Sequence, residues 1–137
     1  MREITFQKLE FNIIFDNGRW GFRHESEFRS FDKAESCTFL TPLLEGHFAN
    51  VNKFLEKELM DDQKALSSFP FLNILKYVSS NSSSYSINNG LNWLDEGFKI
   101  DEEVILQLQK LIENKNIDQK TRHRISAFLN RKIYSGI

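Results

Sequence analysis

The chain has 137 residues, of which 40% are hydrophobic and 27% are charged, with a formal net charge of −1. These values are ordinary for a globular protein and indicate a single domain, residues 1–137, whose core needs neither a metal nor a disulfide. The only cysteine, Cys37, excludes an intramolecular disulfide. The chain also holds 13 Phe, which indicates either a bulky core or exposed aromatic anchors at a binding surface.

No stretch of the chain approaches the roughly 18 apolar residues that a membrane span requires. The first residues alternate polar and apolar side chains and lack the apolar run of a signal peptide. Together with the absence of a cysteine pair, these features predict a cytoplasmic protein that does not contact a membrane.

Charge is distributed unevenly along the chain. Residues 115–137 carry six basic residues and one acidic residue, net +5, whereas the rest of the chain is net −6. Such asymmetry bears on the choice of partner more than on the fold.

Residues 1–40 are predicted to be rich in β-structure, with a hairpin around Asn17-Gly18 as the clearest element. Apolar side chains alternate with mostly polar ones from Leu9 to Phe15, which is the period of a strand. Asn-Gly is the preferred pair for a two-residue type I′ turn, and a two-residue turn fixes the register. The predicted pairs are Asp16 with Arg19, Phe15 with Trp20, Ile13 with Phe22, and Asn12 with Arg23. Residues 3–7 are predicted to add a further strand.

The segment after the hairpin is predicted to change from strand to helix near residue 41. Residues 25–35 predict a turn or a short helix, and the aromatic and β-branched bias of residues 36–40 predicts a short strand. Thr41-Pro42 then predicts a helix N-cap and first helical residue. A helical stripe follows at Leu44, Phe48, Val51, Leu55 and Leu59. Gly46 lies inside that stripe and favours a later helix start.

Further helices are predicted over residues 61–67, after Phe69-Pro70, and from Ile87 to near Gly97. The serine-rich stretch at residues 79–86 predicts a loop, because short polar side chains compete with the backbone for hydrogen bonds.

Two well-delimited helices are predicted at the end of the chain, over residues 101–113 and 118–134. Asp101 and Asp118 are the predicted N-caps, and Ile100 is placed to contact Ile105 across the first turn. The predicted buried stripes are Val104, Leu108, Leu111 and Ile112 in the first helix, and Ile125, Phe128, Leu129 and Ile133 in the second. The short connection predicts antiparallel neighbours.

Together these elements predict an α+β fold, in which an N-terminal antiparallel β-hairpin element packs against a mainly helical C-terminal part, residues 41–137.

The acidic residues are candidates for a partner-binding surface. Clusters of carboxylates flank two helix ends, with Trp93 as a candidate aromatic anchor beside the second cluster; the candidates are Glu56, Glu58, Asp61, Asp62, Trp93, Asp95 and Glu96. Carboxylates beside an aromatic anchor suit a partner with a basic active-site cleft, such as a nuclease. The alternative interpretation is a set of solvated helix ends.

The basic C-terminal helix supports a different hypothesis, that of a nucleic-acid-binding module. Arg122, Arg124 and Arg131 are the candidate contacts to phosphates or guanine edges. The connecting loop has no glycine and the rest of the chain is net negative, whereas such modules carry an overall positive charge. A solvated basic helix face is the simpler interpretation.

No motif in the sequence specifies a reaction, a metal or a cofactor. Arg23, His24 and Glu25 allow a small-nuclease hypothesis, with His24 as general base or acid. The three histidines lack the close spacing of metal ligands, and we expect neither a metal nor a cofactor. Cys37, in an apolar context, is predicted to be a small buried side chain rather than a nucleophile.

The compact chain without a cofactor motif, the Asn17-Gly18 hairpin and the helices with local charge clusters resemble the small bacterial immunity proteins that neutralise contact-dependent inhibition toxins and other polymorphic toxins. The resemblance implies a non-catalytic protein that covers the active site of a cognate toxin domain through electrostatic complementarity. Toxin neutralisation is therefore the leading expectation, and the nucleic-acid-binding module and the small nuclease are the alternatives.

Overall fold

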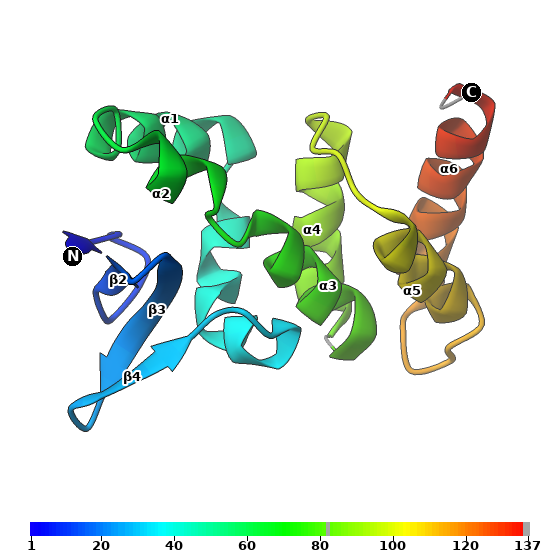
Figure 1. Cartoon of the computed structure of the whole chain (residues 1–137). Coiled ribbons are helices and arrows are strands. Elements are labelled where there is room, and N and C mark those ends of the chain that lie inside the picture. The colour runs from blue at the N-terminus through cyan, green and yellow to red at the C-terminus, as the bar shows by residue number, and fades with distance from the viewer. Residues whose placement is uncertain (82, 136–137) are drawn as a thin grey trace. The chain divides into compact units, whose positions relative to one another are not determined.

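The computed structural model describes residues 1–81 and 83–135. A four-stranded antiparallel sheet comes first in the chain and helices follow it, which confirms the predicted α+β class (Figure 1). The chain divides into two compact units, Met1–Ile74 and Leu75–Ile137. Within the described ranges, no helix combines the length and the apolar composition needed to cross a membrane.

The sheet lies in the first unit and has the strand order β1-β2-β3-β4. Its strands are β1 (Arg2–Ile4), β2 (Ile13–Asp16), β3 (Arg19–His24) and β4 (Glu27–Ser30). The predicted hairpin register is confirmed for Phe15 with Trp20 and Asp16 with Arg19. Asn17 and Gly18 both have positive φ, 54° and 78°, as a type I′ turn requires.

Of the predictions for residues 9–35, one is wrong and one is correct only in part. The strand expected from Leu9 to Phe15 begins only at Ile13, because the preceding chain turns, with the Leu9 amide donating to the Phe6 carbonyl at 3.1 Å. Residues 25–35 are predicted to be a turn or a short helix; Glu25 and Ser26 do form a turn, but the fourth strand follows them. A second hairpin turn at Glu25 and Ser26, with φ values of 51° and 69°, leads into it.

The short strand predicted at residues 36–40 and the helix start predicted at Thr41-Pro42 are also wrong. A 3-10 helix, η1 (Ala34–Glu45), covers both positions and holds Pro42 in its interior. A 3-10 helix has three residues per turn, so Cys37, Leu40 and Leu43 lie on one face, and all three are buried. Gly46 ends this helix, in agreement with the later start predicted for the next one.

Helices and sheet share one core in the first unit. After η1 come α1 (Phe48–Glu58) and α2 (Gln63–Ser67), and α2 agrees with the short helix predicted there. The indole Nε1 of Trp20 donates to the Ala65 carbonyl at 2.9 Å, and the Trp20 ring lies 5.3 Å from that of Phe69. The sheet therefore packs against helical residues, as predicted.

The helix α3 (Phe71–Asn81) begins in the first unit and continues into the second, where α4 (Ser84–Asp95) follows it. The predicted serine-rich loop is mostly helical: residues 79–81 end α3, and residues 84–86 begin α4 with Ser83 as N-cap. Ser82, within that predicted loop, lies outside the described residues. Gly90 allows close packing, since a Cβ there would lie 3.2 Å from a methyl group of Val78.

The last two helices are α5 (Glu102–Ile112) and α6 (Gln119–Ser135), which pack against each other, and α4 also packs against α6. Both predicted N-caps are confirmed: Asp101 accepts the Val104 amide at 3.1 Å, and Asp118 accepts the Thr121 amide at 2.7 Å. The predicted stripes are buried at Val104, Leu108, Leu111, Ile125, Phe128 and Leu129. The side chain of Ile133 lies outside the described part of the chain.

Candidate functional site

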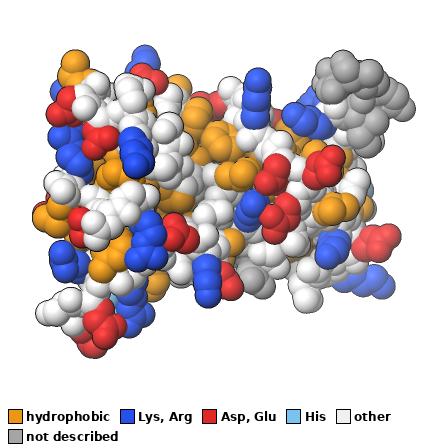
Figure 2. Space-filling model, viewed as in Figure 1, with side chains coloured by type: hydrophobic (Ala, Val, Ile, Leu, Met, Phe, Trp, Pro, Cys, Tyr) orange, Lys and Arg blue, Asp and Glu red, His pale blue; other side chains and the backbone are white. Residues whose placement is uncertain are grey.

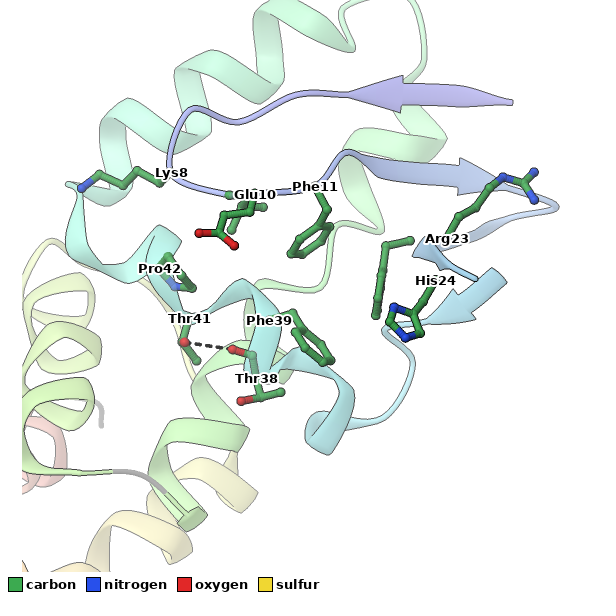
Figure 3. Close-up of a pocket in the computed structure, with 11 residues that line it drawn as sticks. Lys8, Glu10, Phe11, Arg23, His24, Thr38, Phe39, Thr41 and Pro42 are labelled. Atoms are coloured by element: carbon green, nitrogen blue, oxygen red, sulfur yellow. Dashed lines mark hydrogen bonds between the residues drawn. The ribbon is translucent and has the colours of Figure 1, made fainter. Parts of the chain in front are cut away.

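The first unit has a surface groove of about 550 Å³. Its walls come from residues 8–11, the end of β3 and the second half of η1, three segments that are far apart in the sequence (Figure 3). Three phenylalanines line it, and the polar side chains around them are Lys8, Glu10, Arg23, His24, Thr38 and Thr41.

The aromatic lining runs from the core to the surface. Phe31, at 1% exposure, stacks on Phe22 with ring centres 5.3 Å apart. Phe22 in turn lies 5.1 Å from both Phe11 and Phe39. Phe39 meets Phe11 edge-on at 6.3 Å and remains 48% exposed. The groove thus holds a large apolar side chain in a fixed position with half of its surface open to a ligand.

Polar side chains surround this aromatic centre. Figure 3 shows Lys8 and Arg23 extending outward from the groove, whereas Phe11 and Phe39 lie near each other inside it. The Thr41 hydroxyl donates to the Thr38 carbonyl at 2.9 Å, and both threonines line the groove. An apolar centre inside a polar rim is the usual composition of a protein-binding surface.

His24, the general base or acid of the nuclease hypothesis, lies in the wall of this groove with 54% of its side chain exposed. Its Nε2 is 3.9 Å from Oε1 of Glu25, and the Glu25 side chain is 84% exposed. That separation is longer than a hydrogen bond. Among the residues that the structure describes, no three His, Cys, Asp or Glu side chains are grouped to hold a metal ion.

The predicted acidic set at the end of α1 belongs to the first unit, and most of its members have structural contacts. Asp61 forms an ion pair with Arg2 at 2.7 Å, and Asp62 caps α2 by accepting the Ala65 amide at 3.1 Å. Glu56 accepts a hydrogen bond from Asn52 at 3.0 Å. The carbonyl of Glu58 accepts from Arg2, which leaves the exposed Glu58 carboxylate out of that contact.

The second acidic set belongs to the other unit, and one of its predicted roles is wrong. Trp93 is 0% exposed and packs in the core of α4, so it is not an exposed aromatic anchor. Trp93 lies off the predicted apolar stripe of α4, which suggested that it was exposed. The prediction failed because this helix is buried on more than one side. Asp95 accepts from both Arg124 at 3.0 Å and Arg131 at 3.1 Å. The Glu96 amide caps the end of α4.

The candidate nucleic-acid contacts on α6 are engaged within the second unit. Arg124 donates to the carbonyl and side-chain oxygens of Asn88 at 3.1 and 2.9 Å, and also to Asn92 and Asp95. Arg131 pairs with Asp95. The Nε of Arg122 donates to the Ile117 carbonyl at 3.1 Å. On the face that Figure 2 shows, described basic and acidic side chains are interspersed rather than gathered into one broad patch of either sign.

Cys37 belongs to η1, the helix that forms one wall of the groove, and is a core residue, as predicted. It is 0% exposed, and its Sγ donates to the Phe31 carbonyl at 3.6 Å. Burial, aided by the negative charge of Glu35, raises the pKa of the thiol to about 12. The side chain therefore stays a neutral thiol at physiological pH.

Comparison of the chain with protein-family models, curated proteins and solved structures finds no match.

Proposed function

We propose that this chain is a protein-binding protein, and specifically an immunity protein that neutralises a cognate toxin domain by covering its active site in the cytoplasm. The observation that supports the proposal is the half-exposed Phe39 ring at the centre of a polar-rimmed groove. Interfaces concentrate their binding energy in a few such central residues, and aromatic side chains supply large contact areas.

The aromatic groove also favours a preformed binding surface over one that orders on binding. Phe39 is held by two neighbouring rings and by a helix that buries Cys37, Leu40, Leu43 and Leu44, so little rotational freedom remains for a partner to remove. Preorganisation of this kind improves affinity by reducing the entropy lost on association.

In this proposal, exposed charges govern the encounter rather than the final contact. The carboxylates of Glu56 and Glu58 are exposed in the same unit as the groove. Charges of this kind speed the approach of a basic partner, and salt screens the effect. Asp95 has less support for this role, because Arg124 and Arg131 already neutralise it.

A nucleic-acid-binding role for α6 has less support than protein binding. The guanidinium of Arg124 donates to three residues of α4, so a phosphate would have to compete with those contacts. A phosphate-binding surface normally presents free Lys and Arg donors.

The test is neutralisation of a toxin domain encoded next to this chain. Co-expression of the two should restore growth of cells that the toxin domain alone inhibits, and the purified pair should associate more slowly as salt is raised from about 50 to 500 mM. Absence of both a complex and protection would refute the proposal. If Phe39→Ala still neutralised the toxin domain and bound it with unchanged affinity, the assignment of the groove as the binding site would be refuted.

A further inference from the structure

We propose that β4 is a self-association edge, which pairs antiparallel with β4 of a second copy of this chain about a two-fold axis. This inference goes beyond the toxin-binding function and does not depend on it. β4 is the last strand in the sheet order, so one side pairs with β3 and the other side is an edge (Figure 1).

The turn at Glu25 and Ser26 determines which backbone groups face outward from this edge. In a two-residue hairpin the flanking residues, His24 and Glu27, exchange hydrogen bonds, and the pattern then alternates along the strands. The Phe31 amide continues it by donating to the Trp20 carbonyl at 2.8 Å. The N–H and C=O groups of Phe28 and Ser30 therefore point away from β3.

These outward groups are suited to pair with another strand. Among the described residues, no hydrogen bond from another segment reaches the backbone of Phe28 or Ser30 on that side. Natural edge strands are protected by proline, by bulges, by shortness, or by charged side chains, lysine above all, that repel a second strand. β4 is short, but it contains no proline, lysine or bulge, and its two charges, Glu27 and Arg29, are of opposite sign and can attract a matching strand.

The strand is also held firmly enough to present a fixed edge. The Phe28 ring lies over Gly21, where a Cβ would come within 2.6 Å of it, and Arg19 lies 5.7 Å from the ring centre on a cation–π contact. Phe28 is thus fixed on one face of the sheet. Glu27 and Arg29 point to the opposite face, since they lie across from His24 and Phe22.

Charge selects one register for the pairing and identifies the partner as a second copy. Outward residues must oppose outward residues, which permits Phe28 opposite Phe28, Phe28 opposite Ser30, or Ser30 opposite Ser30. The last register pairs only Ser30, because β4 ends there. The second register places Arg29 opposite Arg29, which repels. The first places Glu27 of each copy opposite Arg29 of the other, twice by symmetry. Both side chains are exposed and have no ion-pair partner among the residues that the structure describes.

The paired edges are short, so we expect a weak dimer rather than an obligate one. A stable interface usually buries on the order of 1,000 Å² or more, which four residues of edge do not supply. The expected dissociation constant is therefore roughly 0.1 to 1 mM, within reach of sedimentation equilibrium and of NMR titration by dilution.

Charge reversal provides a matched test in the full-length chain. Glu27→Arg and Arg29→Glu each create like-charge pairs and should weaken self-association about tenfold or more. The double variant Glu27→Arg/Arg29→Glu restores opposite charges and should restore the dimer. Equimolar Glu27→Arg and Arg29→Glu should form a heterodimer, because each then faces its opposite charge.

The controls are circular dichroism of every variant and the reversal Lys110→Glu, an exposed charge on α5 that should leave self-association unchanged. A wild-type chain that stays monomeric to about 1 mM would overturn the proposal. So would a dimer that both single reversals leave unchanged, or single variants that fail to complement each other, since these results place the contact elsewhere.

Discussion

Gly21 offers the sharpest test of the structure of the β-sheet. A Cβ at this position would lie 2.2 Å from the Arg29 carbonyl oxygen and 2.6 Å from the Phe28 ring. Ordinary contacts begin near 3.4 Å, so Gly21→Ala requires backbone of β4 to move by about 1.2 Å. A flexible side chain could rotate away from such a contact, but a carbonyl within a strand pair cannot.

The expected cost follows from the terms that this displacement changes. Overpacking costs about 1 to 3 kcal/mol, and weakening of two strand hydrogen bonds adds roughly 1 kcal/mol each. The unfolded chain has less entropy with alanine than with glycine, which offsets about 0.4 to 1 kcal/mol of this cost. The net loss of unfolding free energy is therefore about 2 to 4.5 kcal/mol, or roughly 7 to 16 °C in Tm for a chain of this size.

Urea denaturation followed by tryptophan fluorescence and circular dichroism measures this loss, since Trp20 adjoins Gly21 in β3. Gly46→Ala is the matched control, because its Cβ would meet nothing closer than 3.9 Å and its φ is −98°. We expect the control to lie within about 0.5 kcal/mol of wild type. Equal stability of the two variants would refute the β3–β4 packing described above.

Three further predictions concern other residues. Arg124→Ala should lower the unfolding free energy by roughly 1 to 2 kcal/mol in urea denaturation because it leaves several oxygens of α4 without a donor; Arg122→Ala, which loses one contact, should cost less, and equal costs would contradict this role. The hydroxyl and backbone amide of Thr121 hold the pKa of Asp118 below its ordinary value of 3.8, so the charged cap stabilises the fold above that pH and the contribution is lost as pH falls through the lower, folded-state pKa. The difference in urea midpoint between wild type and Asp118→Asn should thus shrink between pH 7 and pH 2, and a constant difference would contradict the linkage. Cys37, with its raised pKa and complete burial, should resist iodoacetamide at pH 8 in the native chain and react once urea unfolds it; rapid native labelling would show that the thiol is accessible.

The sequence predicts local structure well where chemistry restricts the backbone. Asn17-Gly18 favours positive φ at both positions, and the turn sets the pairing of Phe15 with Trp20. Asp101 and Asp118 are short acceptors placed before helical patterns, and both cap their helices. In each case the signal lies within about four residues of the structure that it specifies.

Tertiary contacts explain where sequence-based prediction fails in the first unit. Glu25 and Ser26 adopt the same left-handed turn as Asn17-Gly18, but neither residue type signals it. Packing of Phe28 over Gly21 and of Phe31 against Phe22 fixes β4, and both contacts join segments that only the fold brings together.

The candidate site was also missed in the sequence because it depends on contacts between distant segments. The sequence signal of η1 is an apolar side chain at every third residue, Cys37, Leu40 and Leu43. A search for the strand period of two and the α-helical period of 3.6 misses it. The groove depends on η1 because this helix brings Phe39 beside Phe11 and Phe22. The sequence shows the acidic residues as clustered charges but not their partners. In the structure, Asp61, Asp62 and Asp95 are already hydrogen-bonded or paired within the chain.

Binding of the proposed partner, a toxin domain encoded next to this chain, to wild type and Phe39→Ala, measured by isothermal titration calorimetry, tests the central claim most directly. Loss of a central aromatic anchor should weaken affinity by about 2 kcal/mol or more, some thirtyfold. Leu106→Ala removes a side chain that is likewise exposed, at 57%, but lies on α5, and should leave affinity within about twofold of wild type. Equal affinities of wild type and Phe39→Ala would contradict the assignment of the groove as the binding site.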